Sequence, residues 1–191
     1  MSIFKSIAVA TAISLSSTHA FAQAFGINQG EKIENLEVVE DLGNFLYQVT
    51  PPIPVSGFSA YVVMATPESG ACMVRALGDT FERDGFGENI RSRFATLAEI
   101  LDGKYGKGHT VDILRSGALW KDPDEWVMAI RQNERVFQAE WTINSEENGI
   151  GDIILTTRAR SRDDSFLALQ YRFLNIKECE NAKSQKDASG L

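Results

Sequence analysis

Apolar and polar residues alternate with a period of two along three stretches towards the end of the chain: 136–143, 152–160 and 166–174. This pattern is typical of strands that have one buried face and one face in water. The connecting segments 144–149 and 161–165 are rich in Asn, Asp, Ser and Gly, which favour tight turns. Because short connections make neighbouring strands antiparallel, the three stretches predict an antiparallel meander.

The preceding part of the chain predicts a hairpin and one more strand. Residues 58–65 and 71–77 have strand character and are separated by a turn-like segment at 66–70. Residues 45–50 also alternate, and they end at the proline-rich segment 51–54. Proline cannot donate a hydrogen bond to a sheet, so 51–54 is expected to be an extended edge or a loop.

A second period, of three and four residues, predicts helices. The clearest case is an apolar stripe formed by Ile90, Phe94, Leu97, Leu101 and Tyr105. A stripe of this kind is expected to pack against the apolar face of the meander. Asn89 is the predicted N-cap, and the glycine-rich segment 103–108 is expected to end the helix.

Two shorter helices are also predicted. Residues 31–40 place Ile33 and Leu36 at helical spacing, and residues 122–130 begin with Asp122, Pro123 and Glu125, the residues of a capping box. The intervening residues 109–120 are expected to form a loop or an extended segment. Residues 180–191 are polar and small, and predict a flexible tail.

The N-terminal residues predict an export signal. Lys5 precedes an apolar run from Ile7 to Leu15, and a small-residue site ends at Ala22. This arrangement predicts cleavage after Ala22, with an uncleaved anchor as the alternative. No cysteine follows the site and no later apolar run is long enough to span a membrane. We therefore expect residues 23–179 to form one soluble domain, periplasmic or secreted, without a lipid anchor.

The two cysteines, Cys72 and Cys179, predict a disulfide. An exported chain with an even number of cysteines most simply pairs them, and a pair of buried thiols is the alternative. The two positions lie far apart in the sequence, so the bridge would join the two halves of the domain, 23–85 and 86–179.

Charge and composition exclude several functions. The formal net charge is −7, and removal of Lys5, the only charged residue of 1–22, gives −8, which argues against a nucleic acid or an anionic membrane as partner. His109 is the only histidine left in the mature chain, so catalytic triads and multi-histidine zinc sites are not expected. The segment 103–108 follows a helix and lacks the ending of a phosphate-binding loop, so no nucleotide, metal or other cofactor is predicted.

The elements together predict an α+β fold with antiparallel sheet packed on helices, and with two related helix-plus-three-strand units as an option. The order of elements resembles the tandem units of the beta-lactamase-inhibitor protein and of small outer-membrane assembly lipoproteins. Short segments at Phe25-Gly26, Gly70 to Cys72 and Lys104 to Gly106 resemble small exported proteobacterial proteins without an assigned activity. These resemblances imply an envelope compartment and no mechanism.

The solvated face of the meander carries the candidate partner-binding residues. They are Gln138, Glu140, Arg158, Arg160 and Arg172. Arginine suits protein interfaces because its planar guanidinium pairs with carboxylates and stacks on aromatic rings. We therefore expect a protein-binding or inhibitory module. The alternatives are an ordinary solvated sheet face and, for activity, a carboxylate-dependent hydrolase of cell-envelope glycan.

Overall fold

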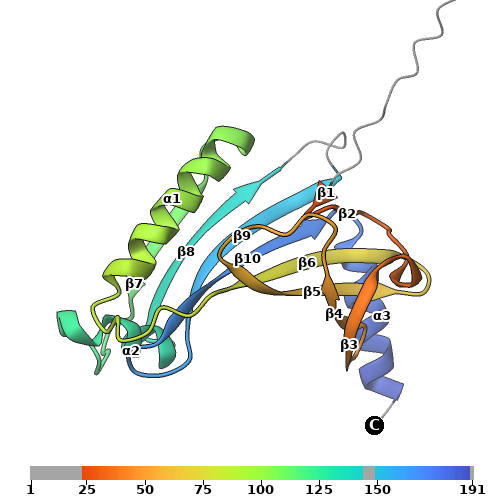
Figure 1. The fold of residues 1–191 in the computed structure, drawn as a ribbon. Coiled ribbons are helices and arrows are strands. Elements are labelled where there is room, and N and C mark those ends of the chain that lie inside the picture. Colours follow the sequence, from red (N-terminus) through yellow and green to blue (C-terminus); the bar gives the residue numbers. More distant parts are fainter. Residues whose placement is uncertain (1–22, 144–148, 190–191) are drawn as a thin grey trace, which may run out of the picture.

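The computed structural model describes residues 23–143 and 149–189, and it has the predicted α+β fold (Figure 1). One eight-stranded antiparallel sheet packs against helices, and a separate two-stranded sheet lies near the start of the described chain. The predicted signal peptide, 1–22, and the turn residues 144–148 lie outside the described residues.

The elements follow one another in a simple order. The strands are β1 (Gln23–Ala24), β2 (Ile27–Asn28), β3 (Glu37–Gly43), β4 (Leu46–Thr50), β5 (Phe58–Thr66), β6 (Gly70–Gly78), β7 (His109–Leu114), β8 (Arg135–Thr142), β9 (Ile150–Ala159) and β10 (Ser165–Phe173). The helices are η1 (Ile33–Asn35), α1 (Glu88–Tyr105), η2 (Pro123–Glu125), α2 (Trp126–Arg131) and α3 (Ile176–Ser189).

The strand order of the large sheet is β3-β4-β5-β6-β10-β9-β8-β7. Two antiparallel meanders, β3 to β6 and β7 to β10, therefore meet where β6 pairs with β10. Each half contributes four strands, not the three of the predicted unit, because β3 and β7 add an edge strand on either side. The predicted strands 136–143, 152–160 and 166–174 and the hairpin 58–77 are confirmed as β8, β9, β10 and β5–β6.

One face of the sheet carries the hydrophobic core. The stripe of α1 is buried at Ile90, Phe94, Leu97 and Leu101, as predicted. It packs beside β9 and β10, and α2 packs beside β8 and β9. Figure 1 shows α1 near the β7–β8 side of the sheet and α3 at the other side, near β3 to β5.

The start of α1 differs from the prediction. Asn89 lies inside the helix, and the N-cap position, Gly87, is in the left-handed region with φ of 70°. The buried carboxylate of Asp84 satisfies the free backbone donors: it accepts from the backbone N–H of Asn89 at 3.2 Å and of Ile90 at 3.0 Å. Sequence spacing missed this cap because Asp84 lies outside the usual capping position. The capping box at 122–125 is confirmed.

Two other predictions of local structure were wrong, those for residues 31–40 and 180–191. Residues 31–40 form only the single turn η1, and then β3 pairs with β4; an isolated helix of this length is marginal, whereas pairing satisfies the backbone along a ready sheet edge. For residues 109–120 the extended alternative is confirmed in part, because 109–114 are the edge strand β7, which begins at His109. Residues 180–189 continue helix α3 instead of forming an irregular tail.

The predicted disulfide is confirmed. Cys72 in β6 and Cys179 in α3 are bonded, with Cα atoms 6.3 Å apart, and both are fully buried. Asn175 adds a second attachment, because its Nδ2 donates to the backbone carbonyls of Ser69 at 3.1 Å and Ala71 at 3.2 Å. These contacts hold α3 against the first half of the sheet.

Candidate functional site

The face of the sheet opposite the core contains a hollow of about 510 Å³. We call it the seam hollow, because β6 of the first meander and β8, β9 and β10 of the second supply its walls. Its lining consists of Arg75, Leu77, Gln138, Ile154, Thr156, Arg158, Ala159, Phe166, Ala168 and Gln170. This volume lies in the range of roughly 300 to 1,000 Å³ that is usual for ligand sites.

The hollow forms around a small side chain. Ala168 in β10 pairs with Leu77 on one side and with Thr156 on the other. Its neighbours on the same face of β10 are the much larger Phe166 and Gln170, since side chains two apart along a strand share a face. An alanine between larger side chains leaves a depression on the middle strand.

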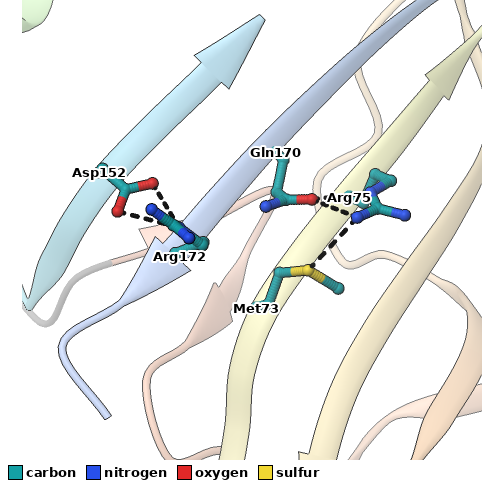
Figure 2. Close-up of polar contacts among 5 residues, drawn as sticks. All are labelled: Met73, Arg75, Asp152, Gln170 and Arg172. Atoms are coloured by element: carbon teal, nitrogen blue, oxygen red, sulfur yellow. Dashed lines mark hydrogen bonds and ion pairs between the residues drawn. The ribbon is translucent and has the colours of Figure 1, made fainter. Parts of the chain in front are cut away.

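Arg75 lines the seam hollow and contacts Gln170 and Met73 (Figure 2). Its Nε donates to Oε1 of Gln170 at 2.8 Å, and a second guanidinium nitrogen lies 4.0 Å from the sulfur of Met73. Partial burial lowers the pKa of Arg75 from its ordinary value, and the positive charge of Arg158 lowers it further. Within residues 23–143 and 149–189, no carboxylate forms an ion pair with Arg75.

Arg158 supplies the second positive charge. It is exposed on β9, where it pairs with Phe166 of β10, and it lines the seam hollow. The described part of the chain gives it neither an ion pair nor a hydrogen bond. Two guanidinium groups thus share one hollow whose own polar groups are neutral amides and a hydroxyl. An anion would relieve their mutual repulsion.

Arg172, in contrast, is already neutralised. Its Nε donates to both carboxylate oxygens of Asp152, at 2.7 and 2.9 Å (Figure 2). The hydrogen bond to Asp152 raises the pKa of Arg172, burial opposes that rise, and the charges of Asp152, Glu180 and Glu140 add to it. Asp152 and Arg158 lie toward opposite ends of β9, roughly 20 Å apart at about 3.3 Å per residue.

The predicted set of arginines therefore does not form one cluster. Arg172 lies away from the seam hollow, and Arg160 follows the end of β9, with its guanidinium carbon 4.6 Å from the ring centre of Phe166. Of the other predicted residues, Gln138 lines the hollow and Glu140 lies two positions further along the same face of β8. Trp126 is buried in the core.

Sequence patterns did not reveal Arg75. It meets Gln170, 95 positions later in the chain, only because β6 pairs with β10. Strand alternation places Arg75 on the polar face of the hairpin. No local pattern, however, states which strand of the second meander lies next to that hairpin.

The pKa of Asp102 is lowered to about 2 by hydrogen bonds from Lys107, the backbone of Gly108 and Trp141, against a smaller opposing effect of burial. A glycosidase acid needs a raised pKa, so Asp102 is unsuited to that role.

Within the ranges that the structure covers, no three His, Cys, Asp or Glu side chains gather to hold a metal ion. No helix of those ranges is long and apolar enough to cross a membrane.

No protein-family model, curated protein or solved structure matches the chain. The resemblance to beta-lactamase-inhibitor-like units and to small exported proteins therefore stays a prediction, and function is inferred from the site itself.

Proposed function

We propose that this protein is a periplasmic or secreted binding module that recognises an anionic part of another protein through the seam hollow. The observation that carries the proposal is the pair Arg75 and Arg158, which share the hollow without a carboxylate partner among the described residues. Arginine pairs carboxylates bidentately, and such pairs are frequent anchors of protein interfaces.

The compartment is supported by two independent features. The buried Cys72–Cys179 disulfide is consistent with an oxidising, extracytoplasmic environment. The predicted signal peptide at 1–22 indicates export. Binding, as a competitor or as an inhibitor of the partner, needs no catalytic group, which suits a chain with one histidine after the predicted cleavage site.

The proposal is tested by capture of partners from an envelope extract of the source organism, followed by titration of the purified partner by calorimetry. Arg158→Glu should weaken binding by about tenfold or more, because it reverses a charge at the contact. Arg115→Glu is the matched control, since Arg115 is exposed and outside the hollow. Equal binding by both variants and wild type would contradict the proposal, and so would the absence of any specific partner.

A further inference from the structure

The side chains around Arg75 and Arg158 indicate which class of ligand the seam hollow binds. Leu77 and Phe166 are half-buried apolar residues of the same lining as the two arginines, and the nearly buried Ala168 lies between them. An Asp or Glu side chain of a partner would pair with an arginine but would leave these apolar side chains in water. The best complement is a ligand that carries a carboxylate and an apolar side chain on the same carbon.

The size of the hollow favours the end of a chain. A volume of about 510 Å³ is larger than one side chain, so the hollow has room for backbone atoms together with a side chain. Gln138 on β8, Thr156 on β9 and Gln170 on β10 offer neutral hydrogen-bonding groups in the same hollow. A peptide terminus uses all of these features: carboxylate, apolar side chain and backbone amide.

We propose that the seam hollow binds the free C-terminal carboxylate and the apolar side chain of the last residue of a partner protein. This inference rests on the proposed function and names the part of the partner that enters the hollow. Arg158 and Arg75 pair with the carboxylate, and the side chain lies over Ala168 between Leu77 and Phe166. Gln170, which already accepts from Arg75, holds that guanidinium at the wall of the hollow.

The charge of Arg75 fits this role. Partial burial and Arg158 both lower its pKa from its ordinary value, which means that the cationic form is held at a cost in free energy. A bound carboxylate reverses the sign of the local potential and relieves that cost. Among the described residues, the carboxylate of Asp152 provides this compensation for Arg172. Arg75 contacts only neutral groups, the amide of Gln170 and the sulfur of Met73.

Synthetic peptides test the inference even before a partner has been identified. The probe is acetyl-Gly-Gly-Leu with a free carboxylate, titrated into the isotope-labelled protein while the backbone amide signals of Gln138 and Thr156 are followed by NMR. Comparison ligands are the same peptide as its C-terminal amide, acetyl-Gly-Glu-Gly-amide, and N-acetyl-leucine. We expect the free-acid tripeptide to bind about tenfold or more tightly than each comparison ligand, since charge-assisted hydrogen bonds and backbone contacts are lost in them.

Substitutions of the two arginines test whether the tripeptide binds in the seam hollow. Arg75→Gln and Arg158→Gln should each weaken the tripeptide by about tenfold, whereas Arg115→Gln should leave its affinity unchanged. Thermal unfolding of each variant shows that it is folded. Equal affinity for the acid and the amide, equal affinity for the internal glutamate peptide, or no shift at Gln138 and Thr156 would each overturn the inference. Equal affinity for N-acetyl-leucine would overturn the assignment to a protein terminus in favour of a small free acid.

The two proposals fail in different ways. If Arg158→Glu abolishes capture of a partner and the tripeptide does not bind, the protein recognises another anionic feature, and only the terminal-residue inference is overturned. If the tripeptide binds with the expected pattern and no partner is captured, the hollow binds the stated chemistry and the proposed function is contradicted.

Discussion

The side chain of Trp126 packs against the N-terminal end of α1 and also contacts Arg135 of β8. The guanidinium carbons of Arg91 and Arg135 lie 5.4 and 5.7 Å from the centre of its ring. Gly87 approaches the same ring so closely that a Cβ at this position would overlap it, and its φ of +70° suits glycine. The sequence around Gly87 predicted the helix, but it could not show that a distant tryptophan requires the glycine.

Gly87→Ala should therefore destabilise the protein by about 2 to 4 kcal/mol, from backbone strain and overlap with Trp126. Gly103→Ala is the matched control within α1, because its Cβ would meet nothing within 4 Å. That variant should stabilise by about 0.5 to 1 kcal/mol, through helix propensity. Urea unfolding measures both changes in stability, and a Gly87→Ala protein as stable as wild type would contradict the close packing of Gly87 against Trp126.

Asp102 predicts a dependence of stability on pH. Its pKa is lowered to about 2 in the folded protein by its hydrogen bonds, so the ionised form stabilises the fold above the ordinary carboxyl range and this contribution is lost as the pH falls toward 2. The difference in melting temperature between wild type and Asp102→Asn should be greatest at pH 7, narrow below pH 4 and nearly vanish at pH 2. A difference that stays constant across this range would show that the charge has no part in it.

Among the helices and strands, sequence periodicity predicted those that bury a regular apolar face and missed those that are mostly exposed. The meander, the β5–β6 hairpin and α1 each bury a regular face, and such faces leave a clear pattern in the sequence. Edge strand β3 is exposed along its whole length, so no alternation marks it. Helix α3 buries only Cys179, and a helix with so little apolar surface looks like a polar tail in the sequence.

The position of α3 should depend on its covalent attachment. In the double variant Cys72→Ala plus Cys179→Ala, we expect fast amide hydrogen exchange along residues 180–189, with β9 and β10 still protected. The loss of a disulfide typically costs about 2 to 4 kcal/mol of stability, partly through the unfolded chain. Hydrogen exchange followed by mass spectrometry resolves the two regions. Unchanged protection of α3 would show that its noncovalent contacts are sufficient.

Across the whole molecule, the sheet joins two meanders, and the candidate site lies at their junction. Local patterns correctly placed Gln138 and Arg158 on the solvated face. The site could not be completed from the sequence because its other wall, with Arg75 and Leu77, comes from the first meander. Arg172 is not part of the site, because its neighbour on β9 is Asp152, six residues from Arg158, and its guanidinium pairs with that carboxylate.

The position of the seam hollow at the junction of the two meanders also predicts how a bound ligand changes the stability of the protein. A ligand that contacts β6 together with β8, β9 and β10 binds only when the two meanders are paired, so it stabilises the folded protein by mass action. At about 100 times its dissociation constant, the purified partner should stabilise wild type by about 2.7 kcal/mol. An unchanged melting temperature at saturation would contradict binding across the junction.

Binding of the partner in the seam hollow is tested most directly by the affinity of the purified partner for a protein whose hollow is filled. Ala168→Leu fills the depression without a change of charge, and Ala60→Leu is the matched control, because Ala60 pairs with Leu77 but does not line the hollow. We expect Ala168→Leu, shown to be folded by its melting temperature, to bind at least about tenfold more weakly than wild type, while Ala60→Leu binds normally. Wild-type affinity in a folded Ala168→Leu protein would contradict binding in the hollow.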